Sequence, residues 1–142
     1  DWSSDVCSSD LIVRGICSLI PGVPGMSENI EAISIVDKYL EHSRVYIFGN
    51  NGDPEVYISS ADFMTRNLDA RVEVTCPIYD EDIKKEMLET FEIGWKANVK
   101  ARLHSEKLDN KYRKQPDQKM FRAQHELYNY YRDKLEVIAE NI

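Results

Sequence analysis

The stretch LEHSRVYIFGNNGDPEVYISSADFMTRNLDARVEV, residues 40–74, decides the fold class of this chain. Residues 44–49 and 55–60 are rich in β-branched and aromatic residues, and the Asn-Gly pair at 51–52 is a strong signal for a hairpin turn. Residues 70–78 alternate between apolar and polar side chains, which is typical of a half-exposed strand. The stretch therefore predicts consecutive strands of one sheet.

Two further apolar runs lie before this stretch. LIVRGICSL (11–19) and IEAISIVD (30–37) are apolar at odd and even positions alike, as in strands that are covered on both faces. The segment between them, residues 21–29, is rich in proline and glycine and predicts a loop. Residues 38–42 are expected to add a short helical turn.

After Pro77, which we expect to end the third strand, the apolar pattern becomes helical. One stripe is formed by Ile83, Met87, Phe91 and Trp95, and a second by Leu127, Tyr131, Leu135 and Ile138. The stripes predict two amphipathic helices, and Asp80 and Asp82 suit the start of the first. The charged segment 102–121, which contains Pro116, is expected to be a surface loop. Strands followed by helices predict an α/β domain, with a mixed β-sheet flanked by helices.

The first eleven residues, DWSSDVCSSDL, differ from the rest of the chain. They contain a near-repeat, show no apolar periodicity and offer little to bury. The stretch resembles a translated sequencing adapter, so we expect 1–11 to be a non-native tail and 12–142 to be the domain proper. The alternative is a disordered native tail. Because the run that follows begins as a strand with no earlier partner, we expect the domain to be incomplete.

Composition narrows the function classes. A chain of 142 residues and 16.5 kDa is long enough for a single core, and its net charge of −7 argues against a nucleic-acid partner. Cys7, Cys17 and Cys76 show no metal-site spacing, and we expect Cys17 and Cys76 to be reduced and buried. The sequence has no run long enough to span a membrane and no secretory signal, so we expect a cytoplasmic protein whose membrane association is unknown.

Several residues suggest a site for phosphate. Arg14 interrupts an apolar run, where an unpaired cation is costly to bury, so it needs a carboxylate or an anionic ligand. His42 and Arg44 open a strand, and a histidine changes charge near neutral pH, while a guanidinium matches the geometry of phosphate. Ser59 and Asp62 are polar residues at the end of the next strand. These residue types together favour an anion site.

Each of these residues also has a structural interpretation. Arg14 could form an internal ion pair, and His42 could be a structural histidine. The segment 59–62 is typical of a helix cap or a turn. His104 and His125 fall in charged or helical surface contexts, and we assign them no role. On residue chemistry alone, the alternatives stay open.

An ordered series of motifs adds a family resemblance. RGICSLIPGVPGMSENIEAISIVDKYLEHSRVYIF (14–48), YISSADFMTRNLDARVEV (57–74) and AQHELYNYY (123–131) together resemble the carboxy-terminal domain of bacterial polyphosphate kinase. The resemblance extends from about Leu11 to the end of the chain. It implies a phospholipase-D-like fold and a phosphotransferase that reversibly transfers the terminal phosphate of ATP to polyphosphate through a phosphorylated histidine.

The resemblance also implies roles for particular residues. His42, in LEHSR, matches a catalytic histidine that contacts the nucleotide phosphates and assists transfer as an acid or charge stabiliser. Arg14, in RGICSL, matches an arginine that binds the ATP phosphates. The phosphorylated histidine of the family belongs to an earlier domain outside this chain. Mg²⁺ is also bound mainly by residues outside this chain, so no metal ligand is assigned here. The implied partners are ATP, ADP and inorganic polyphosphate, and the implied full-length enzyme is a homo-oligomer.

Two rival functions remain. His42 and Arg44 followed by ISSAD look like a degenerate phospholipase D signature with arginine in place of lysine, which suggests a phosphodiesterase with His42 as nucleophile. That enzyme would need the lysine and a second, paired histidine motif, and the sequence has neither. The other rival is a noncatalytic interaction domain with Arg14 paired internally. Departures from the family pattern at Phe63, Thr65 and Ala70 affect local packing only.

Overall fold

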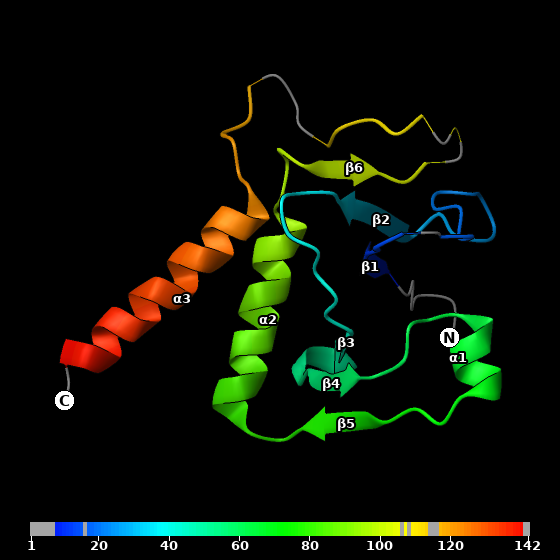
Figure 1. Ribbon diagram of the computed structural model, residues 1–142. Helices are drawn as coiled ribbons and strands as arrows, with labels where there is room; N and C mark the ends of the chain where they lie inside the picture. The colour runs from blue at the N-terminus through cyan, green and yellow to red at the C-terminus, as the bar shows by residue number, and fades with distance from the viewer. Residues whose placement is uncertain (1–7, 16, 106, 108, 114–116, 141–142) are drawn as a thin grey trace. The chain divides into compact units, whose positions relative to one another are not determined.

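The computed structural model describes residues 8–15, 17–105, 107, 109–113 and 117–140, and for residues 138 and 140 it describes the backbone alone. The chain divides into two units, one made of residues 1–40 and 93–142 and the other of residues 41–92. Each unit has its own three-stranded sheet (Figure 1).

The sheet of the first unit is mixed. It contains β1 (Ser9–Ile12), β2 (Ile30–Ile35) and β6 (Ala101–Leu103) in the order β1-β2-β6. β1 runs parallel to β2, whereas β6 runs antiparallel to it. The parallel pair needs a long connection, which residues 13–29 provide. This sheet thus has the mixed strand directions that the sequence predicted.

The core of the first unit lies where β2 meets the ends of two helices. Ile33 is 1% exposed and packs with the buried residues Ala97, Ala101 and Ala123. Helix α3 (Ala123–Glu140) begins in this cluster. Small residues allow close approach here, and at Gly94 an added Cβ would lie 3.0 Å from Ile12 Cδ1. The core is therefore compact but small.

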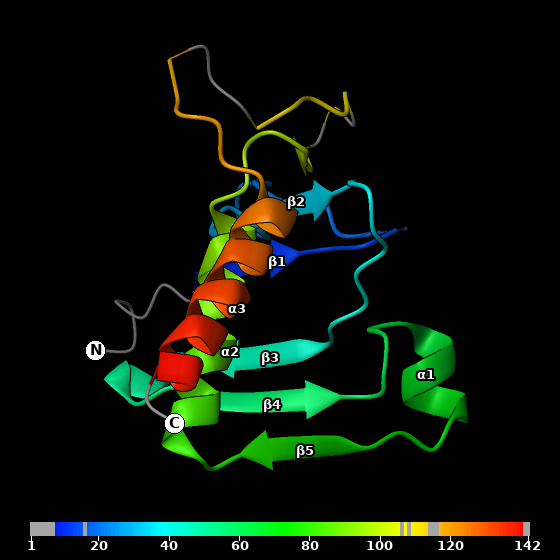
Figure 2. The ribbon, with the colours of Figure 1, turned by 60° about the vertical axis from the view of Figure 1, so that its left-hand side comes forward.

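The sheet of the second unit is an antiparallel meander, β3 (Val45–Phe48), β4 (Glu55–Ser59) and β5 (Thr75–Ile78). A short 3₁₀ turn, η1 (Asn50–Gly52), joins β3 to β4, and Gly52 there has a φ of 95° that favours glycine. Val56, in the central strand, is 1% exposed. Figure 2 shows the three strands side by side, with α1 (Thr65–Ala70) in the connection from β4 to β5. The predicted hairpin is confirmed.

Both predicted helices are present. α2 (Glu81–Trp95) contains the first apolar stripe, and α3 contains the second. Asp80 Oδ1 accepts hydrogen bonds from the backbone N–H groups of Asp82 and Ile83, both at 3.0 Å, which is how a side chain caps the start of a helix. Over the residues that the structure describes, no helix is both long and apolar enough to cross a membrane. The predicted α/β class is confirmed, but the strands form two small sheets and not the single sheet that we expected.

Several predicted strand limits are wrong. The run 11–19 is a strand only as far as Ile12, and β1 starts at Ser9, inside the stretch expected to be a tail. Whether residues 1–11 are native stays a prediction, and Cys7 lies outside the described residues. Residues 38–42 form no helical turn. The charged segment 102–121 contributes to β6 and is not wholly loop, while its Pro116 lies outside the described residues.

The third strand of the meander was also placed wrongly. It begins at Thr75, and Val72 before it is 99% exposed. Pro77 lies inside the strand, paired with Tyr57. Proline is accepted because β5 is an edge strand, where its missing N–H removes no bond to a further strand. Cys76 on this strand is exposed, contrary to the expectation of a buried thiol.

Candidate functional site

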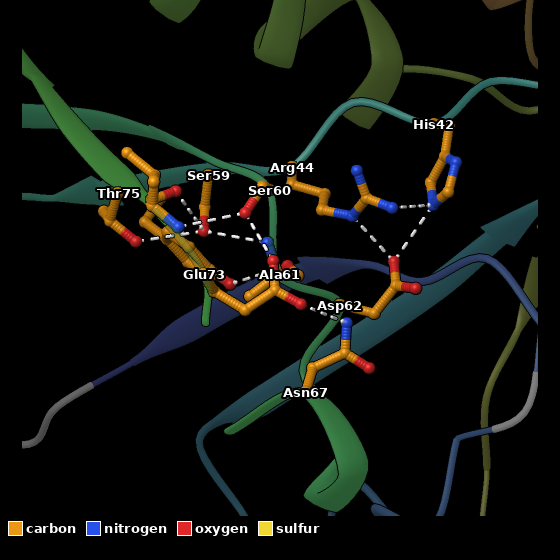
Figure 3. Close-up of polar contacts among 11 residues, drawn as sticks. His42, Arg44, Ser59, Ser60, Ala61, Asp62, Asn67, Glu73 and Thr75 are labelled. Carbon is orange, nitrogen blue, oxygen red and sulfur yellow. Dashed lines mark hydrogen bonds and ion pairs between the residues drawn. The ribbon is translucent and has the colours of Figure 1, made fainter. Parts of the chain in front are cut away.

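The second unit brings His42, Arg44 and Asp62 together in one cluster (Figure 3). His42 and Arg44 precede β3, and Asp62 follows β4. The two strands are antiparallel neighbours, and the Ser59 N–H extends their pairing by donating to Arg44 O at 2.9 Å. The start of one strand therefore lies beside the end of the other, which explains why residues 18 to 20 positions apart meet.

Asp62 is the anchor of this cluster. Its Oδ1 lies 2.8 Å from Arg44 Nε and 3.0 Å from His42 Nε2. The hydrogen bond from Arg44, followed by that from His42, holds the pKa of the Asp62 carboxyl far below its usual range. The side chain of Asp62 is 29% exposed and that of His42 is 44% exposed. The cluster is thus a charged group that water and ligands can reach.

His42 Nε2 has two competing partners. Arg44 Nη2 lies 2.5 Å away and can only donate, while Asp62 Oδ1 can only accept. One ring nitrogen cannot accept from Arg44 and donate to Asp62 at once. With a proton on Nε2, His42 donates to Asp62; without it, Nε2 accepts from Arg44. The proton on His42 therefore decides which neighbour holds the imidazole.

The serines at the end of β4 have a structural role. Ser60 Oγ donates to a carboxylate oxygen of Glu73 and accepts from the Val74 N–H at 3.0 Å. Ser59 Oγ accepts from the Ala61 N–H at 3.1 Å. These bonds form a turn, as one interpretation of the sequence predicted, whereas α1 has no side-chain cap. Asp62, the last residue of the segment 59–62, contacts His42.

Arg14 occupies a different place from the one predicted. Because β1 ends at Ile12, Arg14 lies after the strand and is exposed, so no buried cation has to be neutralised. Among the described residues none forms an ion pair with it, and the internal ion pair stays a prediction. Arg14 borders an open hollow of about 320 Å³ in the first unit, whose polar lining consists of Arg14, Ser34, Arg102, His104, Ser105 and Asn110.

His104 is the residue that sequence reasoning missed. It follows β6, and its Nε2 lies 2.6 Å from Ser34 Oγ in β2. The error came from assigning 102–121 to a loop, which hid the pairing of β6 with β2. The alternation Ala101-Arg102-Leu103-His104 was the signal that could have revealed a short strand.

Of the residues predicted to bind phosphate, His42 belongs to the second unit and Arg14 to the first. That both contact one phosphate chain stays a prediction. Over residues 8–15, 17–105 and the later described segments, no three His, Cys, Asp or Glu side chains gather as metal ligands do.

The fold and these clusters define an α/β domain with Arg and His side chains gathered in each of its two units. The model of the family described as "Polyphosphate kinase C-terminal domain 2" matches residues 6–124. The chain belongs to that family.

Individual relatives agree with this assignment. The chain is 50% identical over 128 residues to a polyphosphate kinase of Escherichia coli strain K12, and 48% identical over 128 residues to one of Klebsiella pneumoniae. Each alignment covers 90% of this chain and 19% of the relative. The crystal structure of polyphosphate kinase from Porphyromonas gingivalis matches with a TM-score of 0.88 and 45% identity, over 92% of this chain and 20% of that one. The chain thus spans about one fifth of the length of these relatives.

Proposed function

We propose that this chain is part of a polyphosphate kinase, a phosphotransferase that reversibly moves the terminal phosphate of ATP onto polyphosphate. Its phosphorylated histidine lies outside this chain, and the segment described here binds the ATP phosphates through Arg14 and His42. The full-length enzyme is a cytoplasmic homo-oligomer that uses Mg²⁺ held mainly by residues elsewhere. The observation that carries the proposal is the His42–Asp62–Arg44 cluster within a chain of this family.

The cluster suits a group that has to carry a proton next to phosphate. The Asp62 carboxylate accepts a hydrogen bond when His42 carries a hydrogen on Nε2, and this bond fixes the orientation of the ring. A protonated His42 can donate to the oxygen that bridges the β- and γ-phosphorus atoms, where negative charge develops as the bond to the γ-phosphorus breaks. Arg44 adds positive charge beside the same ring. His42 is therefore assigned the role of acid or charge stabiliser.

Arg14 supplies the second part of the proposed site. An exposed guanidinium without an ion-pair partner among the described residues is free to bind an anion. Its planar set of N–H donors matches two oxygens of a phosphate group. The donors neutralise the nonbridging oxygens, whose charge would otherwise oppose attack at the γ-phosphorus.

The test is polyphosphate synthesis from ATP by the full-length protein that carries this chain. His42→Ala and Arg14→Ala should each lower the rate by about 100-fold or more, as expected for an acid or a charge-stabilising donor. The controls are His125→Ala, at an exposed histidine of α3, and Arg66→Ala, at an exposed arginine of α1. If both His42→Ala and Arg14→Ala make polyphosphate at the parent rate, the assignment of the site is wrong.

Assays of the same variants also test the alternative function, a phosphodiesterase. Clustering of His42, Arg44 and Asp62 is the observation that favours it. In that enzyme His42 would be the nucleophile, and the full-length protein would hydrolyse a phosphodiester without ATP. Hydrolysis that needs His42, with no polyphosphate formed from ATP, would support the alternative over the kinase.

A further inference from the structure

His104 lines the same hollow as Arg14. His104 follows β6 and Arg14 follows β1, and these two strands lie on opposite sides of β2 in the sheet order β1-β2-β6. The backbone N–H of His104 donates to Ala32 O at 3.0 Å, which continues the pairing of β6 with β2 by one residue. The ring is half-buried, and Nε2 lies 2.6 Å from Ser34 Oγ. The sheet thus fixes the position of this imidazole.

The direction of the His104–Ser34 hydrogen bond follows from a second contact. Ser34 Oγ also lies 2.7 Å from Val13 O, a carbonyl oxygen that can only accept. The serine has a single hydroxyl hydrogen, and this contact uses it. His104 Nε2 must therefore carry a hydrogen and donate to Ser34. In the neutral ring Nδ1 then has no hydrogen, and when His104 gains a proton, Nδ1–H becomes a new donor.

The charge around His104 favours an anion. Arg14 and Arg102 are the charged residues that line the hollow among those the structure describes. Arg102 is held in place, because its guanidinium lies 3.4 Å from the centroid of the Tyr112 ring. Asp109 contacts the lining through Ser105 Oγ at 3.4 Å, and it is paired with Lys111 Nζ at 2.8 Å.

We propose that His104 is a second phosphate-binding group beside Arg14, and that its protonated ring donates to an oxygen of a linear phosphate chain bound in the hollow. This inference rests on the proposed function, in which Arg14 binds phosphate, and adds a residue of β6 to that site. Because a protonated imidazole adds a positive charge and a further donor, phosphate binding through this residue should be stronger when the ring is protonated.

The experiment measures the dissociation constant of inorganic tripolyphosphate, and in parallel of ATP, for the full-length protein by calorimetry. At about pH 6, where an ordinary imidazole is mostly protonated, His104→Gln should weaken tripolyphosphate binding by about tenfold, the effect of one charge-assisted hydrogen bond. At about pH 8 the variant should match the parent. His125→Gln, which removes an exposed histidine of α3, should change neither value.

A second variant, His104→Arg, separates charge from folding. The arginine carries a permanent positive charge, so this variant should bind tripolyphosphate as tightly at about pH 8 as at about pH 6. Tripolyphosphate itself changes charge over this range, and the pH dependence of the dissociation constant of His104→Gln measures that effect. It is subtracted before the two pH values are compared. His104→Arg decides the matter if His104→Gln does not fold. If His104→Gln weakens the binding of tripolyphosphate alone, the hollow binds the polyphosphate chain. If it weakens the binding of both tripolyphosphate and ATP, the hollow also binds the nucleotide phosphates.

Two results would overturn the inference. If His104→Gln binds like the parent at about pH 6 while Arg14→Ala loses affinity, His104 has no part in binding, and the proposed function stands. If His104→Arg keeps the pH dependence of the parent, the charge of residue 104 is irrelevant. A parent protein that binds neither ATP nor tripolyphosphate would refute the proposed function itself, and this inference with it.

Discussion

At the scale of single residues, one carboxylate organises the second unit's cluster. Asp62 accepts from Arg44 and from His42 through the same oxygen atom. Because both neighbours stabilise the charged form, the pKa of Asp62 is lowered and the carboxyl stays ionised well into the acid range. Asp62 therefore acts as a constant negative charge that positions His42, and it takes no proton itself at neutral pH.

Asp62→Asn should lower polyphosphate synthesis by the full-length protein by about one to two orders of magnitude, because an uncharged amide replaces the carboxylate that orients the His42 ring. The loss should appear in kcat more than in KM. Asp69→Asn, at an exposed aspartate of α1, is the matched control. Parent-like kcat in Asp62→Asn would show that His42 needs no positioning by this carboxylate.

Residue types alone identified part of this cluster. The spacing of His42 and Arg44 before a strand was visible in the sequence, and Asp62 was noted as a turn residue. Their contact depends on the register of β3 against β4, which no local pattern specifies.

For Arg14, the local pattern led to a wrong prediction. Its apolar neighbours predicted a strand through residue 19, but the strand ends at Ile12, so the argument from a buried cation does not apply.

At the scale of elements, an ion pair joins the end of β2 to the start of α3. Arg122 Nε lies 2.8 Å from Asp37 Oδ2, and Arg122 Nη2 lies 2.5 Å from Asp37 Oδ1, a two-point contact. The side chain of Asp37 is 1% exposed, and that of Arg122 is 29% exposed. The hydrogen bond from Arg122 is the main reason that the pKa of Asp37 is lowered.

Arg122→Met should reduce the free energy of unfolding by about 3 kcal/mol at neutral pH, because it leaves a buried carboxylate without its partner. A lowered pKa in the folded state means that this stability is present above the unfolded pKa of about 4 and is lost as the pH falls below it. The difference between parent and variant should therefore shrink in acid. Urea unfolding of the chain at several pH values measures it.

Arg132→Met is the control for this prediction, since Arg132 on α3 pairs with exposed Asp133 at 2.7 Å, and a solvent-exposed ion pair contributes little to stability. An Arg122→Met loss that equals the control, or that grows as the pH falls, would contradict the role given to the Asp37 pair.

Helices were easier to predict than strands. The four-residue spacing from Ile83 to Trp95 specifies α2 because a helix buries one stripe whatever its neighbours are. Short strands such as β6 depend on a distant partner, here β2, and their three residues carry little pattern of their own. The same dependence explains why β5 was placed too early and why Pro77 was expected to end it.

At the scale of the whole molecule, the two residues proposed to bind phosphate, Arg14 and His42, belong to different units. The first unit offers the hollow with Arg14, and the second offers the cluster around His42. The resemblance to the family was visible in the sequence as an ordered set of motifs, and the family assignment is confirmed over residues 6–124. The central proposal is that Arg14 and His42 both contact the phosphates of ATP, and it concerns the full-length enzyme.

ATP binding to the full-length protein tests that claim most directly, with Arg14→Ala, His42→Ala and the double variant compared with the parent. If both side chains contact one phosphate chain, each single change should weaken binding by about tenfold or more, and the double variant should depart from additivity by at least about 0.5 kcal/mol. ATP affinity that is unchanged in both single variants, or losses that simply add, would contradict a shared site.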